Sequence, residues 1–309
     1  MMTLAVMTND LVKDFNGIKA VNQLNLRVPE GAIYGFLGPN GSGKTTTLKM
    51  LTGMTQPTSG TIEVLGEPML FGKQKIQDNI GFLPDVPGFY DWMTAHKFLM
   101  FCGELFHIPT PILKDRVKSL LKTVGLSKSA KKKIGTFSRG MKQRLGIAQT
   151  LINEPKVIFL DEPVSALDPQ GRKEVIDIIQ NLKGKVTVFF STHILSDVER
   201  ICDRVVIINE GMILLEDTIE NIKAMSDTRD IEIESDNATI QALNEMIKEE
   251  RFITNIDLNH QIMTLTVDDL DVARLHLNKV IHENKIMIKK MMIKEPTLED
   301  IYMKVVKQI

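Results

Sequence analysis

The residues with the clearest chemical signature lie in a glycine-rich segment near residue 40. It reads Gly38-Pro39-Asn40-Gly41-Ser42-Gly43-Lys44-Thr45-Thr46. Glycines lack a Cβ, so successive backbone N–H groups can face one anion, and a helix that starts there adds its positive end. Lys44 can reach the β- and γ-phosphates of ATP, and the Thr45 hydroxyl can ligate Mg²⁺. An ordinary glycine-rich turn is the alternative, but the strand-like run before the segment and the helical pattern after it favour a phosphate-binding loop.

A second group of candidate residues follows two apolar runs further along the chain. Asp161 and Glu162 come directly after residues 157–160, and His193 lies just past residues 186–190. We expect Asp161 to hold the hydration shell of Mg²⁺ and Glu162 to polarise the water that attacks the γ-phosphate. His193 is predicted to contact the γ-phosphate or orient that water. The alternative is a pair of solvated loop acids and an ordinary surface histidine.

These side chains depend on elements that bring strand ends to one edge of a sheet. Residues 32–37, 157–160 and 186–190 read as short buried strands, as in a parallel sheet. A helical pattern over residues 170–182 separates the last two and predicts a βαβ unit. Residues 44–52 are predicted as a helix that stops at Gly53. A hairpin over residues 207–215 is expected to close a first domain near residue 220.

Composition restricts the class of protein. The chain has 309 residues, 43% of them hydrophobic and 25% charged, with a formal net charge of −1. These values are typical of a folded protein and give no reason to expect a nucleic-acid partner. Two cysteines far apart favour neither a disulfide framework nor a zinc site, so we expect a reducing compartment. We find no signal-peptide pattern and no apolar run of about 20 residues, so we expect no direct membrane insertion.

A further anion site is predicted at residues 137–143, which read Phe-Ser-Arg-Gly-Met-Lys-Gln. Ser138 can cap a helix over residues 139–152, whose first N–H groups then face an anion. With the preceding motifs, this segment resembles the signature of the nucleotide-binding domain of ABC transporters. The resemblance covers residues 3–220. It implies an ABC-type P-loop NTPase α/β fold, with a mixed sheet and a helical subdomain.

The resemblance also implies that two chains, expected to be identical, complete each other's nucleotide sites. In the family, the signature of one subunit closes on the ATP held by the phosphate loop of the other. The residues that correspond here are Ser138, Arg139, Gly140 and Met141, together with Asp168 in the loop at residues 165–168. Arg139 stands where the signature usually has glycine, and its charge should not harm anion binding.

Three further expectations rest on the same resemblance. Phe15 takes the place of the aromatic residue that stacks on adenine, although a core phenylalanine on the first strand is the alternative. Asp85 stands where many members have glutamine, and its shorter carboxylate could reach Mg²⁺ through water. The aromatic loop at residues 87–93, with Tyr90 and Trp92, either faces a membrane permease or packs under its own helices.

The C-terminal part is predicted as a separate small domain. Its strands and helices follow the order β-α-β-β-α-β over residues 230–294, with the last strand expected over residues 285–294, which is the ferredoxin-like α+β pattern. The hairpin within it is expected to turn near Asn259 and His260. A final helix over residues 297–306 has Thr297 and Asp300 three apart as a cap. We therefore assign residues 1–220 to the ATPase domain and residues 221–309 to an accessory domain with a regulatory or dimer-supporting role.

The predicted function is that of an ATP-hydrolysing subunit that uses ATP and Mg²⁺ and drives a separate integral-membrane permease. The short signature and the appended domain resemble the bacterial antibiotic, bacitracin or lantibiotic export and immunity type. This implies export of an antibiotic, peptide or other amphipathic compound, and peripheral location at the cytoplasmic face of the membrane. A non-transport ABC ATPase acting on ribosomes or nucleic acid is the main alternative. A small-molecule kinase is another, but it leaves the signature without a use.

Overall fold

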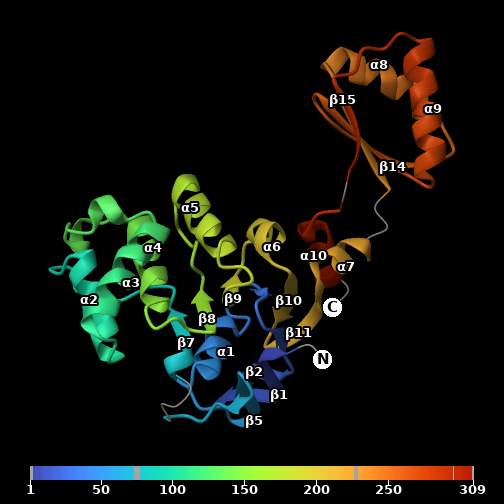
Figure 1. The fold of residues 1–309 in the computed structure, drawn as a ribbon. Coiled ribbons are helices and arrows are strands. Elements are labelled where there is room, and N and C mark those ends of the chain that lie inside the picture. Colours follow the sequence, from blue (N-terminus) through green and yellow to red (C-terminus); the bar gives the residue numbers. More distant parts are fainter. Residues whose placement is uncertain (1–2, 73–76, 226–228, 295, 308–309) are drawn as a thin grey trace. The chain divides into compact units, whose positions relative to one another are not determined.

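The computed structural model describes residues 3–72, 77–225, 229–294 and 296–307. The chain divides into two compact units, Met1–Ile219 and Glu220–Ile309, within which these described residues lie. Figure 1 traces the elements of each unit along the chain.

The central sheet of the first unit has the strand order β11-β10-β4-β9-β8-β7 within the described residues. Its strands are β4 (Ile33–Leu37), β7 (Ile80–Leu83), β8 (Val157–Asp161), β9 (Thr187–Thr192), β10 (Arg204–Asn209) and β11 (Met212–Thr218). All neighbours run parallel except β11, which pairs antiparallel with β10. The sheet is therefore mixed, as the resemblance predicted, and the carboxyl ends of its parallel strands share one edge.

An antiparallel sheet covers part of the same core. Among the described residues it has the order β2-β1-β5-β6, with β3 paired to β1. Its strands are β1 (Leu4–Phe15), β2 (Ile18–Leu24), β3 (Arg27–Pro29), β5 (Ser59–Val64) and β6 (Glu67–Pro68). Phe15 ends β1 and lies opposite Ile18 across a tight hairpin. This position places the Phe15 ring at the end of a hairpin instead of in the sheet interior.

The helices of the first unit fall into two groups. Helices α2 (Ala95–Leu105), α3 (Thr110–Thr123) and α4 (Arg139–Thr150) gather beyond the β7 edge of the sheet as a helical subdomain (Figure 1). Helices α1 (Lys44–Leu51), α5 (Pro169–Gln180) and α6 (Leu195–Ile201) follow strands β4, β8 and β9. Single turns of 3₁₀ helix are η1 (Gln77–Asn79), η2 (Ser127–Ser129) and η3 (Ile134–Thr136).

Aromatic rings fill the middle of the core between the two sheets and α1. The Phe189 ring centroid lies 5.1 Å from that of Phe36, 5.5 Å from Tyr34 and 5.8 Å from Phe159. All four side chains are fully buried and come from adjacent parallel strands. Rings at these separations add to the free energy gained by burying their area. They make the strands that carry the site a rigid support.

The second unit has a ferredoxin-like topology. Its strands are β12 (Asp230–Glu234), β13 (Ile253–Asn259), β14 (Ile262–Val267) and β15 (Lys290–Lys294), in the order β13-β14-β12-β15. Its helices are α7 (Ile219–Ala224), α8 (Asn237–Ile247), α9 (Leu270–Glu283) and α10 (Leu298–Lys307). All its neighbouring strands are antiparallel, so each βαβ unit is split by a strand of the other. The predicted β-α-β-β-α-β order is confirmed.

Two local predictions in the second unit had different outcomes. The cap of the last helix is confirmed, because Thr297 Oγ1 accepts from the Asp300 N–H at 3.2 Å and Asp300 Oδ2 accepts from the Thr297 N–H at 3.0 Å. The strand expected over residues 285–294 is wrong in its first half, since β15 begins only at Lys290. Lys285 has a φ of 52° and continues the turn that follows α9, which delays the strand.

Candidate functional site

The glycine-rich segment forms a tight loop between β4 and α1. Gly43 has a φ of 103°, and a Cβ there would lie 2.3 Å from the Ala20 carbonyl oxygen. A Cβ on Gly38 would lie 2.5 Å from the Ile208 carbonyl oxygen, and Gly41 has a φ of 83°. Gly43 is also the N-cap of α1 and offers no side chain to its first N–H groups. The loop therefore needs its glycines, and it presents the start of a helix that a phosphate fits.

Lys44 begins α1 and turns back over the loop that precedes it. Its Nζ donates to the carbonyl oxygens of Gly38 at 2.7 Å and Pro39 at 3.1 Å. The same Nζ lies 3.4 Å from Glu162 Oε1, and the Lys44 side chain is buried. In the same loop, Pro39, Asn40, Gly41 and Thr45 are exposed, whereas Ser42 is buried and Thr46 is half-buried. The charge of Lys44 is thus held within the loop, next to the exposed residues.

The ends of β8 and β9 bring the two acids and the histidine to the same edge. Glu162 Oε2 lies 2.9 Å from His193 Nδ1, so one carboxylate contacts both His193 and Lys44. Asp161 is buried, and its Oδ1 accepts from Ser191 Oγ at 2.6 Å. The structure therefore brings Lys44, Glu162 and His193 together, and the two adjacent carboxylates face different partners. They do not form an ordinary pair of solvated loop acids.

Ser191 is a site residue to which sequence reasoning gave no role. It lies opposite Asp161 in the β8–β9 pairing, and its Oγ also accepts from the Glu162 N–H at 3.1 Å. Glu162 has a φ of 48°, a left-handed conformation that is unusual for a residue other than glycine. Ser191 therefore fixes the Asp161 side chain and the Glu162 backbone together. The sequence held no local signal for this role, because it depends on how β8 pairs with β9.

The oxygen atoms of Thr45 and Asp161 suit Mg²⁺, a hard cation that is coordinated mainly by phosphate oxygens of the bound nucleotide and by water. Asp161 keeps Oδ2 free of the hydrogen bond from Ser191, and Thr45 is exposed at the start of α1. Over the described ranges, no three His, Cys, Asp or Glu side chains converge on one point. Mg²⁺ needs no such cage, because it keeps several waters and is bound by one or two protein ligands plus phosphate oxygens. Thr45 and Asp161 fit this requirement.

Asp85 and Phe15 lie outside this contact network. Asp85 is exposed in the loop after β7, and its carboxylate makes no hydrogen bond or ion pair with another described residue. The Phe15 ring is 50% exposed, with Lys13 Nζ 4.9 Å from its centroid. The alternative of a core phenylalanine is therefore wrong. An exposed ring beside a cation remains available to another π-system.

The segment at residues 137–143 does cap a helix. Ser138 Oγ accepts from the Met141 N–H at 3.2 Å at the start of α4, with Ser138 and Arg139 exposed and Gly140 and Met141 half-buried. Asp168 caps α5 in the same way, accepting from the Gly171 N–H at 3.3 Å. A Cβ on Gly140 would lie 3.6 Å from Gly171 Cα, so the two helices start side by side. Among the described residues, no hydrogen bond or ion pair joins Ser138 to Lys44 or Glu162, which leaves this second helix start apart from the first site.

The aromatic loop is partly packed and partly exposed. Phe89 packs edge-on against Phe98 of α2 at 5.2 Å between centroids, which agrees with the expectation that rings pack under their own helices. Trp92 is 68% exposed and Tyr90 is 49% exposed, and their rings are 6.0 Å apart. These two rings therefore form an exposed aromatic pair in front of α2.

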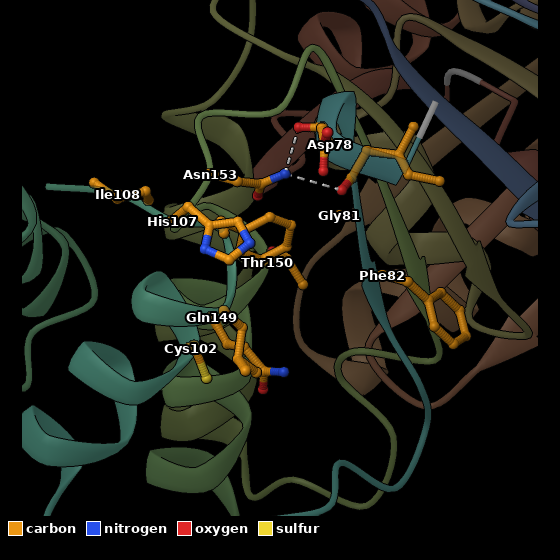
Figure 2. A pocket seen from close by; sticks show the side chains of 12 residues that line it. Asp78, Gly81, Phe82, Cys102, His107, Ile108, Gln149, Thr150 and Asn153 are labelled. Carbon is orange, nitrogen blue, oxygen red and sulfur yellow. Dashed lines mark hydrogen bonds between the residues drawn. The ribbon is translucent and has the colours of Figure 1, made fainter. Parts of the chain in front are cut away.

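A hollow of about 820 Å³ lies between the first residues of β7 and the last turns of α2 and α4. Figure 2 shows Cys102, His107 and Gln149 on the side of the helices and Phe82 across the hollow from them. Asn153 Nδ2 donates to the Asp78 carbonyl at 2.7 Å at its upper end. The hollow is lined by the beginning of β7, whereas Glu162 follows the end of the neighbouring β8, so it is separate from the phosphate loop.

Comparison with known proteins identifies the family. A model of the ABC transporter family matches residues 21–165, and a model of the C-terminal domain of DrrA1-3-like ATP-binding proteins matches residues 218–306. The chain is 39% identical over 297 residues to the ABC transporter ATP-binding protein YxlF of Bacillus subtilis, which covers 96% of this chain and 97% of that protein. It is 38% identical over 308 residues to the bacitracin transport ATP-binding protein BcrA of Bacillus licheniformis, which covers 99% and 98%.

The chain belongs to the ABC transporter ATP-binding proteins. Among solved structures it is similar to CbiO1 from Clostridium perfringens, part of an ABC transporter complex, at a TM-score of 0.66 and 25% identity over 80% of this chain and 96% of that one. It is also similar to a dimeric ATP-binding cassette in a post-hydrolysis state with ADP and phosphate, at a TM-score of 0.63 and 25% identity over 69% and 98%.

Membership of this family confirms the predicted fold class and the predicted ATPase activity. The ABC ATPase domain binds nucleotide, which agrees with the helix start and the buried lysine of the loop at residues 38–46. The resemblance to bacitracin-type subunits with an appended domain is confirmed by full-length relatives of that kind. No helix in the described part of the chain is long and apolar enough to cross a membrane.

Proposed function

We propose that this ABC ATPase drives a separate membrane permease, with two copies closing on two ATP molecules and reopening after hydrolysis. The observation that carries the proposal is the meeting of Lys44, Glu162 and His193 at one edge of the sheet, with Glu162 within 3.4 Å of Lys44 and 2.9 Å of His193. A carboxylate between a cation and an imidazole is placed to take a proton from an attacking water.

The remaining residues receive their roles from this arrangement. The N–H groups of residues 38–46 and Lys44 bind the phosphates of ATP, and Glu162 polarises the attacking water while His193 contacts the γ-phosphate. Thr45 and Asp161 hold Mg²⁺, which when bound neutralises charge on the phosphate oxygens. Asp85 reaches the same ion through water, and Phe15 stacks on adenine. The exposure of Phe15 and its neighbour Lys13 supports this last role.

The second helix start supports a site shared between two copies. Ser138, Arg139, Gly140 and Met141 surround the N-terminus of α4, and Asp168 lies beside it at the start of α5. A helix N-terminus attracts anions, yet this one has no contact with the chain's own phosphate loop among the described residues. We infer that it binds the γ-phosphate of the ATP held by a second copy. The similar cassette that was solved as a dimer with ADP and phosphate supports the pairing of two copies.

The permease partner and the cargo rest on the relatives. They include bacitracin transport proteins and a Nod factor export protein, and CbiO1 is part of a multisubunit transporter complex. We therefore propose export of an antibiotic, peptide or other amphipathic compound, with this chain held peripherally at the cytoplasmic face of the membrane. The exposed pair Tyr90 and Trp92 is the proposed contact with the permease, because exposed aromatic rings are enriched where partners dock.

Replacing Glu162 with Gln tests the proposal directly. The amide keeps the shape of the side chain but is a poor base, so we expect hydrolysis to fall by about 10²- to 10⁴-fold. ATP should then hold two copies together, detected as a dimer by size-exclusion chromatography with light scattering. Glu67→Gln, which changes an exposed carboxylate on β6, is the matched control and should behave as the parent. Normal hydrolysis by Glu162→Gln would contradict the assigned role, and purification with ribosomes instead of a membrane protein would contradict transport.

A further inference from the structure

The contact between α5 and α6 joins two loops of the proposed site. Helix α5 starts directly after Asp168, and α6 starts two residues after His193. Arg172 lies in the first turn of α5 and Asp197 in the first turn of α6. Any interaction between these two side chains therefore connects the segment after Glu162 with the segment that carries His193.

Arg172 and Asp197 form a close ion pair in which the carboxylate is buried and the arginine side chain is 34% exposed. Arg172 Nε lies 2.8 Å from Asp197 Oδ1 and 3.0 Å from Oδ2, and the terminal Nη2 lies 2.8 Å from Oδ1. Nη2 also donates to Ser196 Oγ at 2.9 Å, next to Asp197 in the chain. Asp197 is only 5% exposed, and a carboxylate at that burial is rarely found without a partner. The guanidinium thus bonds both Asp197 and Ser196 in the first turn of α6, and its planar geometry fixes the orientation of the Asp197 carboxylate as well as its distance.

The pair is not needed merely to join the helices. Val175, Ile176 and Ile179 of α5 are buried, as are Val198 and Ile201 of α6, so both helices are anchored by apolar packing. Arg200 and Asp177 form another ion pair between the same helices at 2.9 Å, and both are exposed. Burying the Asp197 carboxylate costs desolvation energy, so the pair is weak evidence for stability, whereas such a pair can select one arrangement of the parts it joins. Selection of an arrangement is therefore the role to consider here.

A continuous series of contacts runs from Glu162 through the Arg172–Asp197 pair and back to Glu162. The Ser165 N–H donates to the Glu162 carbonyl at 3.1 Å, and the Arg172 N–H donates to the Asp168 carbonyl at 2.9 Å. Arg172 forms the ion pair with Asp197, which lies four residues after His193 in the chain. His193 Nδ1 in turn lies 2.9 Å from Glu162 Oε2. These contacts thus begin at the backbone carbonyl of Glu162 and end at the Glu162 carboxylate, which is proposed to act on water.

We propose that Arg172 and Asp197 are a positioning pair, which holds His193 in place against Glu162 and so sets the rate of ATP hydrolysis without contacting ATP. The inference rests on the proposed function, because it assumes that Glu162 and His193 serve hydrolysis. The pair acts on the chemical step. Nucleotide binding by Lys44 and the loop at residues 38–46 is independent of it.

The test compares Asp197→Asn with Asp177→Asn in the full chain, by steady-state ATP hydrolysis and by equilibrium binding of a fluorescent ATP analogue. We expect Asp197→Asn to lower kcat by about tenfold to a hundredfold, as a small misplacement of a reacting group does, with nucleotide affinity unchanged within about threefold. Asp177→Asn breaks the exposed pair between the same helices and should keep the parent kcat. Equal kcat values for the parent and Asp197→Asn would overturn the proposal.

A stable double variant separates positioning from simple stability. Arg172→Met combined with Asp197→Leu replaces both charges with apolar groups, and such exchanges are often neutral or stabilising. We expect its thermal unfolding to match the parent while kcat stays low. If the double variant unfolds like the parent and also hydrolyses ATP at the parental rate, the pair has no positioning role. A parent chain that binds but never hydrolyses ATP would instead contradict the proposed function itself.

Discussion

Glu162 Oε2 lies 2.9 Å from His193 Nδ1, at the junction of two neighbouring parallel strands. The other oxygen of the same carboxylate lies 3.4 Å from Lys44 Nζ. Glu162 therefore has one partner that belongs to the phosphate loop and one that belongs to the loop after β9. A change at either partner should alter how the carboxylate meets a water molecule, and the two changes should affect ATP differently.

Replacing His193 with Ala should slow hydrolysis while leaving ATP binding largely intact. The imidazole orients Glu162 and is proposed to contact the γ-phosphate, so we expect kcat to fall by about 10²-fold or more. His96→Ala removes an exposed imidazole from α2 and serves as the control, with parental kcat expected. The measurement is phosphate release at saturating ATP, together with equilibrium binding of an ATP analogue. A His193→Ala variant with parental kcat would remove His193 from the proposed mechanism.

Replacing Ser138 with Ala should have a functional effect beyond the loss of a helix cap. Loss of the hydrogen bond to the Met141 N–H is expected to cost about 1 kcal/mol of stability. Thr94 caps α2 with the same geometry, accepting from the Lys97 N–H at 3.2 Å, and Thr94→Ala should cost a similar amount. If Ser138 binds the ATP of a second copy, hydrolysis falls strongly in Ser138→Ala alone. Equal hydrolysis by the two variants would mean that Ser138 is only a cap.

Both cysteines should resist alkylation in the folded protein. Burial raises the pKa of the Cys102 thiol to about 12 and raises the pKa of Cys202 well above its usual range. At pH 8 a pKa near 12 leaves roughly one thiolate in ten thousand, and the thiolate is the reactive form. Labelling with iodoacetamide, followed by mass spectrometry, should therefore be slow in buffer and fast in guanidinium chloride. Rapid labelling of either cysteine in buffer would show that α2, which carries Cys102, or the end of α6, which Cys202 follows, opens readily.

Local signals in the sequence were sufficient for the phosphate loop and its strands. The apolar runs before Gly38, Asp161 and His193 predicted β4, β8 and β9, because buried parallel strands are apolar on both faces. The helix cap at Ser138 was also predictable, because Ser138 and its partner Met141 are only three residues apart and the contact does not depend on the rest of the fold.

Contacts that depend on strand register were not predictable. Ser191 meets Asp161 only because β8 and β9 pair with those two residues opposite each other. For Phe15, the family resemblance implied an exposed ring that stacks on adenine, whereas the local sequence also allowed a core phenylalanine; the hairpin to Ile18 shows why the ring is exposed. The start of β15 was predicted too early because Lys285 adopts a left-handed backbone conformation, which its residue type alone does not indicate.

Replacing Phe15 with Ala should weaken ATP binding by a modest factor. Stacking of one ring on another is worth about 1 kcal/mol, which corresponds to roughly a fivefold rise in Kd. Phe15→Trp should keep the affinity, because it also offers a π-face. Ile18 lies opposite Phe15 in the hairpin and is even more exposed, so Ile18→Ala controls for the loss of apolar surface. If Ile18→Ala and Phe15→Ala raise Kd equally, or neither does, the adenine does not stack on Phe15.

Replacing Trp92 with Ala should weaken association with the permease without changing the ATPase site. Trp92 is 68% exposed and contacts Tyr90, so its removal should not open a cavity in the core. Truncating an aromatic side chain that is buried at an interface costs about 2 kcal/mol or more of binding free energy, equivalent to roughly a thirtyfold loss of affinity.

The chain is purified from membranes by an affinity tag, and the amount of polytopic membrane protein that accompanies it is compared between variants. Met54→Ala, which removes an exposed apolar side chain outside this loop, is the control. The contact is supported if Trp92→Ala loses the membrane partner while the isolated chain hydrolyses ATP at the parental rate. Equal recovery of the partner by both variants contradicts the contact, because an exposed ring that no partner covers contributes nothing to the association.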